Sequence, residues 1–192
     1  VYYQIADYTK DPKWNTCAQN AEVIYRDKYL VANNGQVPGY WVFPHGLKED
    51  FIRTSDIKSK DAYKLLVQNA SFVSSSPWAD ANQSDWSYMR ETAYGIHAHL
   101  VSPNFGIAIN IPRIEQLKGF AFSQLDQSFV SFTAQYRKPF MIGVLAHALI
   151  AYYEQVNPDP AIVTRLKLAA DYMWTNMWNA TSAGFKYTDD TR

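Results

Sequence analysis

The chain has 192 residues, enough for one domain with a sizeable core, and it carries 18 basic against 18 acidic side chains. This balance produces no field that would attract nucleic acid or an anionic membrane surface, so we expect neither as a partner. One cysteine excludes an internal disulfide, and no stretch reaches the roughly 20 apolar residues of a transmembrane helix.

Aromatic side chains are the most unusual part of the composition. They make up 16% of the residues, with 14 tyrosines and 6 tryptophans. Tyr and Trp combine a large apolar body with a polar group, so they suit surfaces that are half buried and in contact with water. The composition therefore indicates an extensive surface of this kind.

In chain order, four short sequences have the pattern of one helix ending and the next beginning: YTKDPKW, RTSDIKS, LVSPNFG and VNPDPAI. Asp11 and Asp159 precede a proline, Asp56 precedes a helical run, and the third sequence has Ser102 before Pro103. An Asp N-cap accepts a hydrogen bond from a free N–H of the first turn, and Pro has no N–H to leave free. We therefore expect the chain to reverse at each of these four places.

The segments between these reversals have helical period. Residues 14–29, 61–72 and 161–177 repeat at three- and four-residue spacing, which predicts amphipathic outer helices. Residues 141–154 are apolar nearly all round, which predicts a buried inner helix with His147 as a core histidine. In the outer helices the expected buried residues are Cys17, Ala21, Ile24 and Lys28; Ala62, Leu65, Leu66 and Asn69; and Ile162, Leu166, Ala169, Ala170, Met173 and Met177.

The reversals recur about one helix pair apart along the chain. Self-similarity at a fixed spacing of this size favours an array of stacked helical hairpins over a non-repeating bundle. We therefore predict an all-α fold with about four hairpins in a single domain over residues 1–192. The chain ends resemble internal segments, so we expect a processed or truncated product; localisation stays open, and it includes secretion with the signal region absent from this chain.

The connections between one hairpin and the next are long. Because each helix reverses the direction of the chain, all of these connections must emerge at the same end of the array. Connections longer than about 12–15 residues without regular structure are usually functional or disordered, and their aromatic content argues against disorder. They run roughly over 30–47, 73–88, 123–139 and from 179 to the end.

Aromatic rings and polar groups occur together in these connections, and this combination suits a carbohydrate. A sugar ring can lay its apolar C–H face on Trp or Tyr, while its hydroxyl groups need polar partners at the edges. The expected substrate-binding residues are Tyr40, Trp41, His45, Trp78, Trp86, Arg90 and Tyr136. The candidate catalytic residues are Asp80, Asp85 and Glu91.

Each candidate also has a structural interpretation. A carboxylate near a helix start is more often a cap or a partner of the helix dipole than a catalyst. Arg90 and Glu91 open an inner helix, where an ion pair that braces neighbouring hairpins is as consistent with the sequence as a ligand site. Asp189 and Asp190, near the end of the chain, are a weaker candidate pair.

Four stretches carry a resemblance to a known superfamily: YYQIADYTKDPKW, GYWVFPHGLKEDFIRTSD, RETAYGIHAHL and FMIGVLAHALIAYYEQVNPDP. In their style of repeat they resemble the six-hairpin glycosidase-like proteins, the α/α toroids. The resemblance implies a cleft at the loop-bearing end, lined by aromatic and acidic residues, and a glycoside hydrolase or polysaccharide lyase activity. A closed toroid needs on the order of 300 residues, so this chain corresponds to a partial toroid.

Three functions follow from this reading. Hydrolysis needs two carboxyl groups across the scissile bond, about 5 Å apart for retention or roughly 6.5–9.5 Å for inversion. Elimination by a lyase needs a general base and a group that neutralises a uronate, for which Tyr94, His45, His97, His99 and Arg90 are candidates. A binding or scaffold domain would keep the aromatic surface without a pair of acids.

We expect no metal ion and no cofactor. His97 and His99 are two residues apart, so they point to different helix faces and do not form the pair of a helical zinc site. The sequence has no Gly-rich phosphate loop and no GxSxG motif. The expected partner is a carbohydrate, and association of copies through an open edge of the array is a further expectation.

Overall fold

The computed structural model describes residues 1–75 and 82–190. In this part of the chain there are eight α-helices and a single two-stranded antiparallel sheet, so the predicted all-α fold is confirmed. The elements are α1 (Tyr2–Thr9), α2 (Lys13–Tyr25), α3 (Pro44–Thr54), α4 (Ile57–Asn69), α5 (Met89–Leu100), α6 (Ile111–Phe129), α7 (Pro139–Gln155), α8 (Pro160–Asn176), β1 (Trp178–Asn179) and β2 (Gly184–Phe185).

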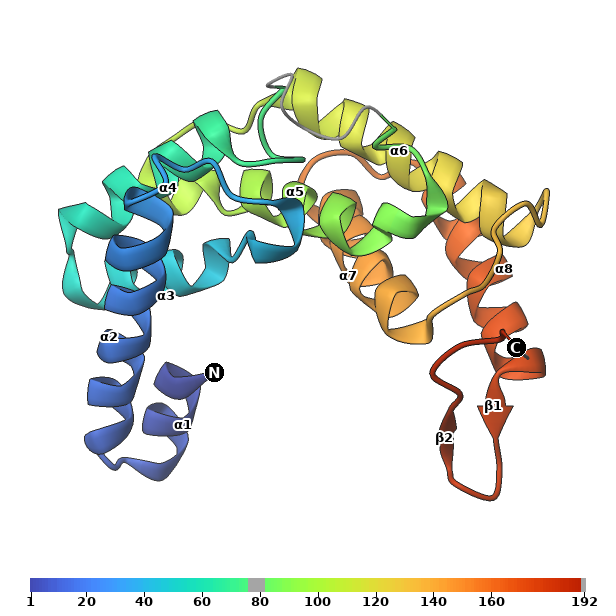
Figure 1. The fold of residues 1–192 in the computed structure, drawn as a ribbon, viewed down its shortest axis with the longest axis horizontal. Helices are drawn as coiled ribbons and strands as arrows, with labels where there is room; N and C mark the ends of the chain where they lie inside the picture. Colours follow the sequence, from blue (N-terminus) through green and yellow to red (C-terminus); the bar gives the residue numbers. More distant parts are fainter. Residues whose placement is uncertain (76–81, 191–192) are drawn as a thin grey trace.

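The helices pair in chain order, α1 with α2, α3 with α4, α5 with α6 and α7 with α8. Figure 1 shows these pairs arranged as an arch in which α3, α5 and α7 lie on the inside and α4, α6 and α8 on the outside. The α1–α2 pair and the β-hairpin form the two legs of the arch, and the opening between the legs is not bridged. The expected hairpin array is therefore present in the described residues as an open arch, and its likeness to a toroid stays a prediction.

Helix α5 joins the two hydrophobic cores of the molecule. Its residues Ala93 and Ile96 belong to the core shared with α6, α7 and α8, while Ala98 belongs to the core shared with α3 and α4. At Gly95 the backbone of Phe72 comes so close that a Cβ would lie 2.9 Å from its carbonyl oxygen. Burial of apolar surface in these two cores is the main stabilising contribution to the arch.

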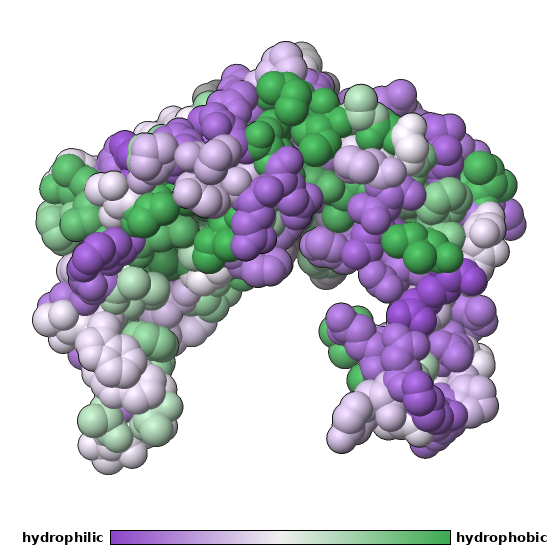
Figure 2. All heavy atoms as spheres, turned by 180° about the vertical axis from the view of Figure 1, so that it is seen from behind, coloured by the Kyte–Doolittle hydropathy of each residue, from purple (hydrophilic) through white to green (hydrophobic). Residues whose placement is uncertain are grey.

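The molecular surface carries both hydrophobic and hydrophilic residues. Figure 2 shows separate hydrophobic patches among hydrophilic residues on one face, and a clear opening between the two legs. The C-terminal leg exposes large rings, with Trp174 63% and Tyr187 68% exposed. No helix among the described residues has the length and apolar character needed to cross a bilayer. Association of copies through these edges stays a prediction.

Three of the predicted helix starts are confirmed. The carboxylates of Asp11, Asp56 and Asp159 accept hydrogen bonds from backbone N–H groups two residues later, at 3.0, 2.9 and 2.9 Å. At Ser102 and Pro103 the chain reverses between α5 and α6 as expected, but the helix start expected there is wrong, because these residues form a short 3-10 turn, η4 (Ser102–Phe105). The next helix, α6, begins only after Asn110, whose side chain caps it.

The predicted buried face of α2 is wrong by one residue. Cys17, Ala21, Ile24 and Lys28 are exposed. The buried positions are instead Ala18, Glu22, Arg26 and Leu30, which recur at four-residue spacing along α2 and the π-helical turn η1 (Arg26–Val31) that follows it. Sequence periodicity placed three apolar residues and Lys28 on the buried face, whereas the interface that α2 makes with α3 is formed by acidic and basic groups.

The prediction of a connection over residues 123–139 is wrong for residues 123–129, because these residues continue helix α6. Gln124 and Ser128 were read as loop residues because they are polar, yet both are buried. The Gln124 amide donates to the carbonyl of Gln83 at 2.9 Å and to the Thr92 hydroxyl at 2.8 Å. Polar residues of α6 thus face the preceding connection rather than solvent.

Arg113 at the start of α6 holds the connection that leads from α4 to α5. Its guanidinium donates to the carbonyls of Phe72 and Val73 at 3.0 and 3.3 Å and to the Gln83 side chain at 2.9 Å. Arg113 is buried, and this burial lowers its pKa. Described residues of this connection therefore obtain three of their hydrogen bonds from one charged side chain.

Each long connection contacts the next, which agrees with their expected gathering at one end of the array. The contacts form a series across the arch and join segments far apart in the sequence. They are Gly39 against the Phe72 ring, the Trp86 and Tyr136 rings at 4.7 Å between centroids, and the Arg137 backbone N–H to the Asp189 carboxylate at 2.6 Å.

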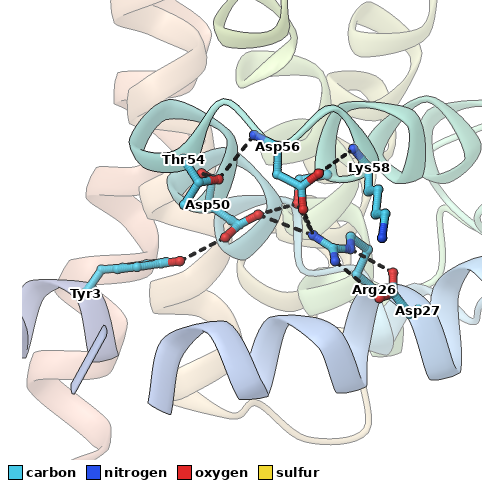
Figure 3. A network of polar contacts seen from close by, with 8 residues as sticks. Tyr3, Arg26, Asp27, Asp50, Thr54, Asp56 and Lys58 are labelled. Carbon is cyan, nitrogen blue, oxygen red and sulfur yellow. Dashed lines mark hydrogen bonds and ion pairs between the residues drawn. The ribbon is translucent and has the colours of Figure 1, made fainter. Parts of the chain in front are cut away.

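Helices α2 and α3 meet through a buried polar network (Figure 3). One nitrogen of the Arg26 guanidinium donates to Asp50 at 3.3 Å, to Asp56 at 2.8 Å and to the Ser59 hydroxyl at 2.9 Å. Tyr3 on α1 donates its hydroxyl to Asp50 at 2.8 Å. The network fixes the N-terminal pair of helices to the rest of the arch.

Glu22 lies beside this network and has no such partner. It is 7% exposed, and its Oε1 atom is sealed from solvent without a hydrogen bond. The pKa of Glu22 is raised to about 7, mainly by burial and then by the negative charge of Asp50. The positive charge of Arg26 lowers this pKa, but by less than Asp50 raises it. An ionised Glu22 is therefore a cost to the folded state.

Replacement of Arg113 by Met should destabilise the protein by about 3 kcal/mol, because three buried carbonyl-type acceptors lose their donor. Urea unfolding of wild type and variant at the same pH measures the difference. Lys167→Met removes a cation from an exposed pair with Asp171 and is the matched control, with a loss of no more than about 0.5 kcal/mol. Equal losses in the two variants would contradict the role assigned to Arg113.

The stability of the protein should fall as the pH rises through the interval in which Glu22 ionises. Below pH 4.5, its ordinary pKa, the carboxyl is protonated in both states; between 4.5 and about 7 it ionises first in the unfolded chain, which favours unfolding. Glu22→Gln removes this effect, so the variant should gain up to about 3 kcal/mol on wild type between pH 4.5 and 8. Urea unfolding of both proteins at the two pH values tests this, and a pH-independent difference would refute it.

Candidate functional site

A cluster of aromatic rings lies where the first long connection meets α3 and α5. The turn η2 (Gly39–Trp41) supplies two of the rings. The Trp41 ring lies 6.0 Å from that of Tyr40 and 5.8 Å from that of Phe43, which in turn lies 5.8 Å from Tyr94 on α5. Tyr40, Trp41 and Phe43 are 47%, 46% and 38% exposed. We call this set, completed by Tyr25 and Tyr29, the aromatic cluster.

The backbone of η2 is held by its neighbours. The Tyr25 hydroxyl donates to the Trp41 carbonyl at 2.8 Å and accepts from the Phe43 N–H at 3.0 Å. Burial raises the pKa of Tyr25, so its hydroxyl keeps its proton. A Cβ on Gly39 would lie 2.9 Å from the Glu91 side chain, so only glycine lets the turn pack this closely on α5. The exposed rings are therefore presented on a fixed support.

Arg90 and Glu91 stand at the start of α5 beside the aromatic cluster. The Arg90 guanidinium lies 5.6 Å from the centre of the Tyr40 ring and donates to Glu91 at 2.6 Å. Glu91 is buried, as the ion-pair interpretation expected. Yet Arg90 Nε and Glu91 Oε2 are both sealed from solvent without a hydrogen bond in the described residues. The pair therefore keeps one unused donor and one unused acceptor.

A row of three histidines crosses the inside layer of the arch. His45 comes from α3, His97 from α5 and His147 from α7, with ring centroids 5.2 Å apart for the first pair and 4.8 Å for the second. His147 Nδ1 and His97 Nε2 are 3.0 Å apart, so one of them donates and the other accepts. The interpretation of His147 as a core histidine is wrong, because His147 is exposed on α7.

Two members of the row, His97 and His45, favour the neutral imidazole. Burial lowers the pKa of His97 to about 4, and the positive charge that His45 and His147 would carry lowers it further. The pKa of His45 is lowered as well, mainly by burial. A neutral imidazole has a free lone pair and can take up a proton, which is the requirement for a general base.

Helical geometry joins the aromatic cluster to the histidine row. Arg90, Tyr94 and His97 are four and three residues apart, so they lie on one face of α5. His99 lies on another face, buried, with its Nε2 at 3.0 Å from the Val73 carbonyl. The aromatic cluster, the Arg90–Glu91 pair and the histidine row thus form one continuous region, which we call the inner-face site.

The inner-face site contains five of the expected substrate-binding and catalytic residues, together with the lyase candidates Tyr94 and His97, and leaves the others elsewhere. Trp86 and Tyr136 pack against each other near Met89 and Met141 and are not part of the aromatic cluster. Asp85 accepts from the Ser87 N–H and hydroxyl at 2.9 and 2.6 Å, which is the capping role. Trp78 and Asp80 lie outside the described residues. The five are Tyr40, Trp41, His45, Arg90 and Glu91.

The weaker acidic candidate Asp189 is fully engaged in a clamp. It accepts from the Arg137 backbone and guanidinium at 2.6 and 2.9 Å and from the Tyr172 hydroxyl at 2.9 Å. These hydrogen bonds lower the pKa of Asp189 although burial opposes them. The carboxylate therefore ties the C-terminal leg to α7 and α8.

Sequence reasoning missed Phe43 and His147. Phe43 precedes the first residue of α3, and its place between Trp41 and Tyr94 follows only from the packing of η2 on α5. For His147 a signal was present, since a lone polar residue in the apolar run of α7 could also mark an uncovered face. The sequence pattern favoured the core interpretation because core histidines are common.

Comparison with known proteins finds no matching family model, no matching curated protein and no matching solved structure. Among the described residues, no group of three or more His, Cys, Asp and Glu side chains is arranged to hold a metal ion. The His45 and His97 rings meet edge to face, and the His97 and His147 rings are tilted and joined by a hydrogen bond.

His97 should remain neutral well below the ordinary histidine pKa. In the folded protein its ring resonances should titrate near pH 4, because burial disfavours the imidazolium. Since the unfolded chain takes up this proton near pH 6.5, stability from His97 is complete above that value and is lost as the pH falls toward 4. NMR of the imidazole groups, assigned with His97→Gln, measures this; titration near 6.5 would disprove it.

Proposed function

We propose that the protein is a carbohydrate-active protein that takes a segment of poly- or oligosaccharide at the inner-face site. The observation that carries this proposal is the set of exposed rings, Tyr40, Trp41 and Phe43, beside the Arg90 guanidinium. Ring faces accept the apolar C–H side of a sugar, and a guanidinium donates to hydroxyl or carboxylate oxygens. The open arch, with its long connections in mutual contact, agrees with a partial α/α toroid.

A glycoside hydrolase-like reaction would use Glu91. Among the candidate acids this is the described one that adjoins the aromatic cluster, and its free Oε2 has no protein partner to displace. Hydrolysis also needs a second carboxyl group across the scissile bond. Asp80 is the remaining candidate for it, and it lies outside the described residues.

The histidine row favours a second candidate function, a polysaccharide lyase. In that reaction a neutral histidine takes the proton from C5 of a uronate, the C4–O bond breaks, the departing oxygen receives a proton, and a C4–C5 double bond forms. Arg90, on the same face of α5 as His97, would neutralise the uronate carboxylate. The alternative to both reactions is a non-catalytic binding or scaffold domain, for which the aromatic cluster alone suffices.

Trp41→Ala should weaken polysaccharide binding at least tenfold, because stacking on an aromatic ring contributes more than 1 kcal/mol at a well-formed site. Affinity electrophoresis against a panel of neutral and uronate polysaccharides, followed by calorimetry on those retained, measures the effect. Trp174→Ala, which removes an exposed tryptophan from α8, is the matched control and should bind as wild type does. Equal binding by both variants, or no binding to any polysaccharide, would contradict the proposal.

The same panel separates the three versions of the function. Hydrolysis releases reducing ends without a new double bond and should be lost in Glu91→Gln. Elimination yields an ultraviolet-absorbing unsaturated sugar and should be lost in His97→Gln. Binding without either product, abolished only by Trp41→Ala, identifies the non-catalytic domain.

A further inference from the structure

A pocket of about 250 Å³ lies between α2 and α3. It is lined by Asp50 and Thr54 of α3, whereas His45 of the same helix contacts His97 in the histidine row. It shares no lining residue with the inner-face site. Most of its lining residues are polar or charged, and they come from α2, η1, α3 and the residue that caps α4. The lining residues are Gln19, Glu22, Val23, Arg26, Asp50, Thr54 and Asp56.

Most of the charged groups in this wall are already paired. Arg26 donates to Asp27 at 2.8 Å as well as to Asp50 and Asp56, so its positive charge is shared among three carboxylates. Asp50 also accepts from the Ser59 hydroxyl at 2.6 Å. These groups form the network of Figure 3 and have little capacity left for a ligand.

Glu22 is the exception in the pocket. More than nine-tenths of the residue is buried, and its Oε1 atom has no hydrogen-bond partner. Its Oε2 atom lies over Gly46 of α3, where a Cβ would come within 2.9 Å. Unpaired buried carboxyl oxygens are costly and rare in folded proteins, so this one marks a place where a donor is missing.

The charge of the surroundings defines the missing donor. The groups that face Glu22 are Arg26 and Asp27 from the α2 side, Asp50 from α3, and Tyr3 from α1. Asp56 adds a further carboxylate to the wall, so acids outnumber the single guanidinium. An excess of acceptors and negative charge in a small space suits a compact cation with several N–H donors and no acceptor, which describes a primary ammonium group.

We propose that the pocket between α2 and α3 is a binding site for a small organic primary ammonium ion, held by the Glu22 carboxylate. The ammonium group supplies the Glu22 carboxylate with the donor that the protein lacks, and its positive charge offsets the excess of acids in the wall. This site is independent of the proposed carbohydrate function, because it uses other residues and another ligand class.

Proton linkage gives the site a pH dependence. A cation binds the ionised carboxylate, and the pKa of Glu22 is about 7, so below that pH binding must release a proton. Affinity should therefore rise about tenfold from pH 6 to pH 8. A site formed by carboxylates with ordinary pKa values would show no change over this interval.

The test is a titration with ethylammonium chloride. Chemical shifts of the backbone amides around Gly46 and of the Gln19 side chain report binding. Wild type at pH 8 should show saturable shifts with millimolar affinity, as expected for a ligand of so few atoms. Glu22→Gln should lower the affinity at least tenfold. Glu154→Gln, which removes an exposed carboxylate from α7, is the matched control and should leave binding unchanged.

Two further measurements keep the proposal falsifiable if Glu22→Gln alters the fold. Tetramethylammonium has the same charge but no N–H donor and should not compete with ethylammonium. Gly46→Ala places a methyl group against Oε2 and should weaken binding without removing any charge. No saturable shift at pH 8, equal competition by tetramethylammonium, or equal affinity of all variants would overturn the proposal.

Discussion

A chain that leaves a helix above a hydrophobic core must find new partners for its peptide groups, and this constraint organises the arch. The described residues of the long connection between α4 and α5 form no helix before η3 (Trp86–Tyr88), and side chains of helix α6 donate hydrogen bonds to their carbonyl groups. Arg113 binds two of its carbonyls, and Gln124 and Gln127 bind two more further along. The connection is thereby fixed over α5 and α6 and becomes part of the scaffold.

The inner-face site follows from the same arrangement. Because each connection is held against the next, the turn η2 packs on the start of α5, and its rings stand beside Arg90 and Glu91. The inside layer of the arch has no helices opposite it, so residues such as His147 that a closed structure would cover are open to solvent. Exposed rings, an ion pair with unused atoms and three histidines thus meet on α3, α5 and α7, and α5 packs into both hydrophobic cores.

The N-terminal pair of helices is joined to the arch by different means. Charged and hydroxyl groups replace apolar contacts between α2 and α3, and Arg26 satisfies most of them. A buried network of this kind is stable only where every member has a partner. Glu22 breaks that rule, and the polar pocket beside it is the natural place to look for what completes it.

The sequence by itself determined the helical class, the four reversals of the chain and most of the caps, because Asp before a helix and apolar spacing act through neighbours along the chain. It also selected Tyr40, Trp41, His45, Arg90 and Glu91. Only the tertiary structure decided that Glu22 and Gln124 are buried and that His147 is exposed. Burial of a polar side chain depends on a segment distant in the sequence, here Gly46 of α3 against Glu22 or Gln83 beside Gln124, and no local pattern carries that information.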